Sequence, residues 1–146
     1  MRIFFSAVIM MLFSFALNAQ TYLQNITVSQ DGSGNFTSIQ AAIDAVRAYS
    51  PEHVTIHIKN GVYHEKVTVY AWVTNISFIG EDREKTVIVY EDYSGKFMST
   101  DTVNNKKKLS TFSSYTMYVH GNDVSIENLT IKNAAGRVGH EQDVST

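Results

Sequence analysis

Residues 54–58 have the sequence Val-Thr-Ile-His-Ile, and this alternation of apolar and polar side chains predicts a short β-strand. The same frame returns in Asn75-Ile-Ser-Phe-Ile-Gly80 and in Asp123-Val-Ser-Ile-Glu-Asn128. Further short strands are predicted at residues 66–70, 86–90, 116–119 and 129–131. Glycine, asparagine and aspartate separate the strands, whereas two-residue hairpin loops are rare. This order of strands and bends predicts a solenoid whose strands stack in parallel layers.

One amphipathic helix is predicted ahead of these strands. Its apolar positions recur every three or four residues, at Phe36, Ile39, Ile43 and Val46. Thr37 and Gln40 fit a capping box, and the helix should end near Tyr49 because Pro51 follows. Since the first coil of a solenoid has no neighbour to cover it, we expect this helix to be its cap. No comparable cap follows Leu129-Thr-Ile131, so the solenoid is expected to be incomplete at its C-terminal end.

The first 19 residues have the pattern of a secretory signal peptide. Arg2 supplies the positive charge, and residues 3–13 form an apolar stretch that only Ser6 interrupts. This stretch is shorter than the roughly 20 residues needed to span a membrane. We therefore expect a mature domain of residues 20–146, secreted or periplasmic, with no membrane attachment after cleavage.

Charge and composition exclude several classes of function. The formal net charge of −2 argues against a nucleic-acid-binding protein, and the absence of cysteine excludes disulfides and a thiolate nucleophile. His53 and His57 lie four residues apart without a third ligand at matching spacing, so no metal site is expected. Ser33 lies in a turn rather than in a G-x-S-x-G nucleophile elbow, which argues against a serine hydrolase.

The segment Gly61-Val-Tyr-His-Glu65 is more specific. Gly61 is expected to adopt the positive φ of a tight corner, and the spacing of Tyr63 and Glu65 places both on one face. An inward carboxylate must be hydrogen-bonded, because an unpaired buried charge is costly. Glu65 is therefore interpreted as a structural tie between coils, with a role in a functional site as the alternative.

Residues 91–110 are polar and interrupt the strand pattern. We interpret them as a solvated loop inserted between two coils. The alternative is that Lys106-Lys-Lys108 forms a basic lip that attracts an acidic polymer.

Five segments occur in the order found in pectin methylesterases. They are Asp31-Gly-Ser-Gly-Asn-Phe-Thr-Ser-Ile-Gln-Ala-Ala-Ile43, Gly61-Val-Tyr-His-Glu65, Ile79-Gly80-Glu81, Thr111-Phe112-Ser113-Ser114 and Asn128-Leu-Thr-Ile-Lys-Asn-Ala-Ala-Gly136. The chain resembles this family over nearly all of its length after residue 19. The resemblance implies an all-β, right-handed parallel β-helix with a short N-terminal capping helix. It also implies an esterase that removes methyl groups from pectin, needs no metal or organic cofactor, and is monomeric when full length.

The resemblance also assigns site residues. The family uses two aspartates as nucleophile and acid/base, glutamines as oxyanion donors and an arginine that orients the nucleophile. These aspartates and the arginine follow the segment that ends at Gly136, so the chain is expected to lack them and to be inactive alone. Gln142 matches the first oxyanion glutamine, although an altered terminal tail is the alternative. Gly61, Tyr63 and Glu65 match a family motif that we expect to be structural.

Substrate contact is assigned by the resemblance to Thr111, with Phe112 as an adjoining apolar wall. The alternative is that Thr111 bonds only to the backbone at a loop-to-strand junction. Two other functions stay open at this stage. A pectate lyase on the same fold would need a calcium-binding carboxylate cluster. A β-helix remnant would bind pectin without catalysis.

Overall fold

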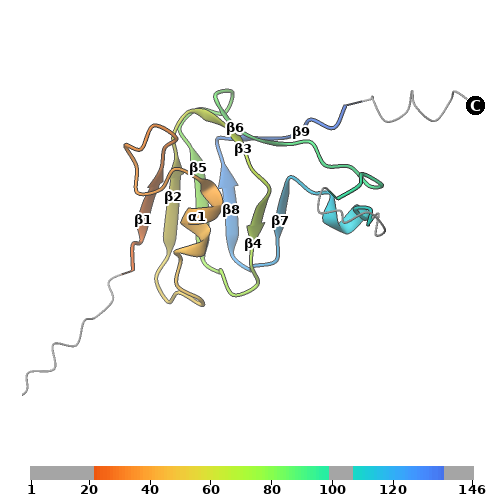
Figure 1. Ribbon diagram of the computed structural model, residues 1–146. Helices are drawn as coiled ribbons and strands as arrows, with labels where there is room; N and C mark the ends of the chain where they lie inside the picture. Colours follow the sequence, from red (N-terminus) through yellow and green to blue (C-terminus); the bar gives the residue numbers. More distant parts are fainter. Residues whose placement is uncertain (1–21, 99–106, 137–146) are drawn as a thin grey trace, which may run out of the picture.

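The computed structural model describes residues 22–98 and 107–136, which wind into a parallel β-helix (Figure 1). Three sheets form its sides, with strand orders β1-β2-β5-β8, β3-β6-β9 and β4-β7. The strands are β1 (Asn25–Val28), β2 (Val54–Ile58), β3 (Gly61–His64), β4 (Val67–Val69), β5 (Ile76–Gly80), β6 (Thr86–Tyr90), β7 (Met117–Val119), β8 (Val124–Glu127) and β9 (Thr130–Asn133). Every pair of neighbouring strands is parallel, so the predicted solenoid is confirmed.

The repeated sequence frame sets the register of the first sheet. Val54 pairs with Ile76, which pairs with Val124, so the three copies of the frame stack directly on one another. Outside the core, the hydroxyl oxygens of Ser77 and Ser125 lie 2.6 Å apart. Asn75 and Asp123, which immediately precede β5 and β8, have φ values of 57° and 54°. Asparagine and aspartate tolerate this left-handed conformation better than most residues, so they turn the chain into each new strand.

The core consists of inward-facing aliphatic side chains with one phenylalanine and one tyrosine. It includes Ile26, Val28, Ile56, Ile58, Tyr63, Val67, Val69, Ile76, Phe78 and Ile88. Along β2 and β5 buried positions alternate with more exposed ones, as a strand that faces the interior on one side requires. On β9, by contrast, Ile131 is 44% exposed.

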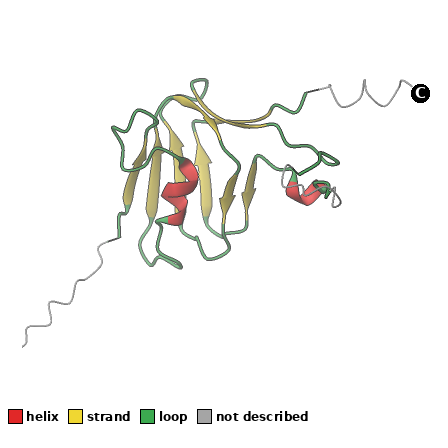
Figure 2. Ribbon diagram, viewed as in Figure 1, coloured by secondary structure: helices red, strands yellow, loops and turns green. Residues whose placement is uncertain are grey.

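Helix α1 (Ile39–Asp44) covers the N-terminal part of this core (Figure 2). It contacts β1 and β4, and it buries Ile39, Ala42 and Ile43, so the predicted cap is confirmed. The helix is shorter than predicted because its flanks bond elsewhere. Before it, Phe36 forms a parallel bridge with Val28.

The N-cap of α1 is Ser38 rather than the predicted Thr37. The hydroxyl of Ser38 accepts a hydrogen bond from the N–H of Ala41 at 3.2 Å. Beyond the helix, the N–H of Tyr49 donates to the carbonyl of Trp72 at 2.7 Å, which holds this part of the chain against the next coil.

The prediction for Gly61 was wrong. Gly61 begins strand β3 and does not have a positive φ. A Cβ atom at this position would lie 2.7 Å from Oε1 of Gln30 and 3.3 Å from the Tyr63 ring, so the flexible Gln30 side chain would have to move to accept one. Gly61 therefore begins a strand beside the Gln30 side chain and does not form a corner.

The described ends of the insertion after β6, residues 91–98 and 107–110, are bonded to one another. Phe97 pairs with Lys108 in an antiparallel bridge, and the N–H of Gly95 donates to the carbonyl of Leu109 at 2.8 Å. Asp92 at its start is buried, contrary to the prediction for this segment. Asp92 can be buried because Lys66 and Lys96 both bond to its carboxylate. None of the helices within residues 22–98 and 107–136 is long and apolar enough to cross a membrane.

Candidate active-site region

The segment with the predicted substrate contacts lies where the insertion returns to the β-helix. Thr111 and Phe112 belong to a single 3₁₀ turn, η1 (Thr111–Ser113), whose ends are tied by reciprocal hydrogen bonds between Ser110 and Ser113. The hydroxyl of Thr111 donates to the hydroxyl of Ser94 at 3.4 Å. Phe112 is 83% exposed, so its ring faces solvent. Both predicted contact residues are thus presented on the surface by a short, internally bonded turn.

Lys66 anchors this turn to the β-helix. It precedes β4, and its ammonium group donates to the carbonyl of Ser113 at 2.6 Å and to Oδ2 of Asp92 at 2.5 Å. Lys96 donates to the other oxygen of Asp92 at 3.0 Å. Lys66 therefore joins the start of the insertion, at Asp92, to its end, at Ser113. We call Lys66, Asp92 and Lys96 the lysine–aspartate clamp.

The charges in the clamp are mutually stabilised. Burial disfavours the carboxylate of Asp92, but hydrogen bonds from Lys66 and Lys96 outweigh it and hold the pKa of Asp92 below its usual value. The hydrogen bond to Asp92 raises the pKa of Lys96. Asp92 and Lys96 are therefore charged near neutral pH, as a buried carboxylate beside cationic partners requires.

Aromatic rings flank the clamp. The ammonium group of Lys66 lies 4.9 Å from the centre of the Tyr115 ring and 5.7 Å from that of Tyr90. These distances are within the range of cation–π attraction. Tyr115 follows η1 directly, so the cation that holds the turn also holds the first ring beyond it.

Of the motif residues Gly61, Tyr63 and Glu65, Tyr63 lies in the core and Glu65 bonds to the N-terminal cap helix. Tyr63 is buried and its hydroxyl donates to the carbonyl of Lys59 at 2.9 Å. Burial raises the pKa of Tyr63, so this hydroxyl stays protonated. The two carboxylate oxygens of Glu65 accept hydrogen bonds from the backbone N–H groups of Ile39 and Gln40, each at 3.0 Å.

Gln40 completes this connection. Its side-chain oxygen accepts a bond from the N–H of Thr68 at 2.8 Å, so helix and coil are bonded in both directions. Adjacent residues thus fasten different elements: Glu65 holds the cap helix, and Lys66 holds η1. The structure does not bring the Tyr63–Glu65 motif and the Thr111–Phe112 pair into one cavity, and Gln142 lies outside the described residues, as does the predicted signal peptide.

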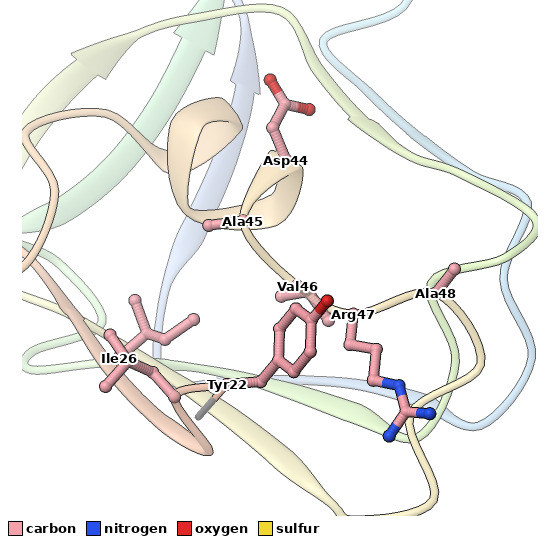
Figure 3. A pocket seen from close by; sticks show the side chains of 8 residues that line it. Tyr22, Ile26, Asp44, Ala45, Val46, Arg47 and Ala48 are labelled. Atoms are coloured by element: carbon pink, nitrogen blue, oxygen red, sulfur yellow. The ribbon is translucent and has the colours of Figure 1, made fainter. Parts of the chain in front are cut away.

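A separate hollow lies beside the cap helix. A notch of about 470 Å³ opens at the C-terminal end of α1 and is lined by Tyr22, Leu23, Ile26, Asp44, Ala45, Val46, Arg47 and Ala48 (Figure 3). The guanidinium of Arg47 lies 5.8 Å from the centre of the Tyr22 ring. Asp44 is the single carboxylate among the lining residues, and none of the predicted site residues reaches the notch. It is therefore not a candidate for catalysis.

Within residues 22–98 and 107–136, no group of three or more histidine or carboxylate side chains is positioned to hold a metal ion.

The clamp was missed by sequence reasoning. Lys66 and Asp92 are 26 residues apart, and neither belongs to a short motif with a known geometry. The stacking of the coils could have indicated it, since one coil of the β-helix separates the start of β4 from the end of β6. Register prediction for the second and third sheets would have placed the two residues at the same corner.

The comparisons with known proteins agree with the fold and the motifs. Residues 25–145 match the Pectinesterase family. The chain is 36% identical over 125 residues to pectinesterase 2 of Arabidopsis thaliana, and 33% identical over 125 residues to pectinesterase 3 of Citrus sinensis. Each alignment covers 86% of this chain but only 19% and 20% of those relatives.

Solved structures give the same result. A pectin methylesterase from Erwinia chrysanthemi superimposes with a TM-score of 0.67 at 29% identity, over 88% of this chain and 34% of that one. The enzyme from carrot gives a TM-score of 0.63 at 31% identity, over 81% and 34% of the two chains. A similar pectin methylesterase was solved in complex with a hexasaccharide, with a TM-score of 0.66. On the sequence match, which spans most of the chain, and on the shared β-helix, this protein belongs to the pectinesterase family.

Proposed function

We propose that this chain supplies the N-terminal coils of a secreted pectin methylesterase, which hydrolyses galacturonate methyl esters to methanol and free carboxylates. The observation that carries the proposal is the family match, which runs from residue 25 to residue 145 and includes every described coil. The hexasaccharide complexes of the structural neighbours support pectin as the substrate. The pattern of residues 1–19 supports secretion.

In this proposal the described coils position substrate, and the bond-breaking groups follow them. A carboxylate attacks the ester carbonyl, a carboxylic acid protonates the departing methoxide, and amide donors stabilise the oxyanion. Gln142 is proposed as one of these amide donors. Thr111 and Phe112 are proposed to contact the sugar chain, because η1 presents both side chains at the surface and the clamp fixes their place.

A chimaera tests the proposal. Residues 25–136 would replace the matching coils of the carrot enzyme, and methanol release from methyl-esterified pectin would be measured, with the unmodified carrot enzyme as the control. We expect the chimaera to release methanol and the isolated chain to release none, since the resemblance places the catalytic aspartates after Gly136. A folded chimaera that neither binds pectin nor releases methanol would overturn the proposal. One that binds pectin but releases no methanol would favour the non-catalytic alternative.

A further inference from the structure

Five aromatic side chains gather on and beside the outer side of the β4–β7 sheet. In β4, Val67 and Val69 point into the core, so Thr68 between them faces outward, and Thr68 pairs in register with Tyr118 of β7. Aromatic residues continue from both strands and from the turn before β7. We call this surface the aromatic face: Tyr70, Trp72, Tyr115, Tyr118 and His120.

The rings of the aromatic face contact one another. Tyr70 and Trp72 stack with ring centres 4.9 Å apart and planes 9° from parallel. Tyr115 and Tyr118 stack at 5.0 Å, and His120 meets the Tyr118 ring edge-on at 4.0 Å. Much of this surface stays open, since Trp72 is 48% and Tyr118 38% exposed. Exposed apolar surface gathered in one place is typical of a binding site rather than of an ordinary protein surface.

Hydrogen bonds hold the face in place before any ligand arrives. The hydroxyl of Tyr115 lies 2.9 Å from the hydroxyl of Thr68, and the side-chain amide of Gln40 donates to the hydroxyl of Tyr70 at 3.4 Å. Lys66 lies against the Tyr115 ring at 4.9 Å. A platform held in this way loses little conformational entropy on binding.

The aromatic face is continuous with the segment proposed to contact substrate. Ser114 alone separates η1 from Tyr115, and Lys66 contacts both the carbonyl of Ser113 and the Tyr115 ring. A polymer that touches Thr111 and Phe112 therefore has the aromatic face next to it. Rings that carry hydroxyl, indole and imidazole groups combine an apolar surface with hydrogen-bonding edges, which suits a sugar ring with its C–H faces and hydroxyl rim.

The charges near the face favour a neutral sugar chain. The ammonium group of Lys66, the cation in contact with the face, is already bonded to Asp92 and to the carbonyl of Ser113. At Tyr70 the nearby charge is negative: the side-chain amide of Gln40 donates to Asp44 at 2.9 Å and to the Tyr70 hydroxyl at 3.4 Å, and the charge of Asp44 raises the pKa of that hydroxyl. Carboxylates of a de-esterified chain would meet this charge, whereas methyl esters would not.

We propose that the aromatic face is a binding surface for methyl-esterified segments of pectin, continuous with the contact at Thr111 and Phe112. This inference rests on the proposed function and adds a location and an ester preference to it. The surface binds the chain as it approaches, and it takes no part in breaking the ester bond.

The chain provides its own probe for the test. Trp72 is the only tryptophan in the sequence, so its emission reports on the aromatic face. Titration of the complete chain with methyl-esterified hexagalacturonate should shift this emission with saturation. Tyr118→Leu should weaken binding about five- to tenfold, and Tyr118→Phe, which keeps the ring, should stay within about twofold of the parent. The matched control is Tyr22→Leu, which removes a similarly exposed tyrosine at the notch beside β1 and should change nothing.

Calorimetry and a Phe112→Ala variant separate this inference from the proposed function. If the oligosaccharide binds and Phe112→Ala weakens it, while Trp72 emission and Tyr118→Leu show no effect, the aromatic face is not a binding surface but the proposed function stands. If no galacturonan binds by either method, the inference fails together with pectin binding by this chain. The de-esterified hexasaccharide should bind at least severalfold more weakly, and equal or tighter binding would overturn the ester preference. Circular dichroism of each variant confirms that it is folded.

Discussion

Replacing Lys66 by methionine tests whether the lysine–aspartate clamp stabilises the β-helix. Methionine keeps most of the apolar length of the side chain but removes the ammonium group. Two hydrogen bonds that Lys66 donates are lost, one to the carbonyl of Ser113 and one to the carboxylate of Asp92. The Asp92 side chain is only 9% exposed, so its charge is left with Lys96 as the remaining cationic partner.

The size of the effect follows from this geometry. Removing one partner of a fully buried ion pair costs about 3–5 kcal/mol. Two features reduce that cost here, because Lys96 still bonds to Asp92 and the Lys66 side chain is itself 26% exposed. We therefore expect Lys66→Met to lower the free energy of unfolding by about 2 kcal/mol, the size of a hydrogen bond to a charged group.

Equilibrium unfolding in urea measures this change, with Lys59→Met as the control, since Lys59 forms an ion pair whose two side chains are about half exposed. The control should lie within about 0.5 kcal/mol of the parent. In a double-mutant cycle with Asp92→Asn, the double mutant should lose less unfolding free energy than the sum of the two single-mutant losses, because both substitutions remove the same interaction. A loss for Lys66→Met no larger than that of the control would refute the reasoning.

The pH dependence of the clamp gives an independent check. The folded pKa of Asp92 is depressed, so the stability that its charge contributes is present above the unfolded pKa of about 3.9 and is lost as pH falls through the folded value. The difference between the parent and Asp92→Asn should therefore be constant from pH 7 to about pH 5 and shrink below pH 4. A difference that persists unchanged at pH 2 would show that the charge of Asp92 is not responsible.

Three further predictions concern single residues. In the chimaeric enzyme, Thr111→Ala should raise KM for pectin severalfold and leave Tm nearly unchanged, because Thr111 is exposed and its hydroxyl forms a long bond of 3.4 Å to Ser94; a lower Tm with unchanged kinetics would assign it a structural role. Hydrogen bonds from Ser29 and Ser33 lower the pKa of Asp31 to about 2. The parent should therefore lose stability between pH 4 and pH 2, whereas Asp31→Asn should lose less. An equal fall in Tm over this pH range in both proteins would contradict this. Gly80→Ala should prevent the last coil from stacking, since the new Cβ would lie 2.2 Å from the carbonyl oxygen of Asn128; parent-like circular dichroism and Tm would contradict it.

Much of the β-helix was predictable because its signals are local. Strand β2 and strand β6 have the predicted bounds, and the three copies of the polar–apolar frame stack in the register that their likeness indicates. Strand β1 was not predicted, since its Asn25-Ile-Thr-Val28 pattern is too short to stand out without the neighbour that pairs with it. Strand β3 was read as a corner because Gly61 resembles a turn residue when its surroundings are unknown.

The site was less predictable, because its contacts join residues far apart in sequence. The spacing within the motif predicted that the side chain of Glu65 points inward. The partners of Glu65, two backbone N–H groups of α1, depend instead on where the helix docks. Likewise, the aromatic residues of the face are spread from position 70 to position 120, and only the pairing of β4 with β7 brings them together. Composition shows aromatic residues but not their gathering on one side of a solenoid.

The lysine–aspartate clamp also determines where this fold can change length. The inserted segment leaves the β-helix at Asp92 and returns at Ser113, and Lys66 holds both points. Because the closing cost of a loop rises only with the logarithm of its length, a longer or shorter connection between these two points changes stability little. The turn that carries Thr111 therefore keeps its position on the coil beneath when the length of the insertion changes.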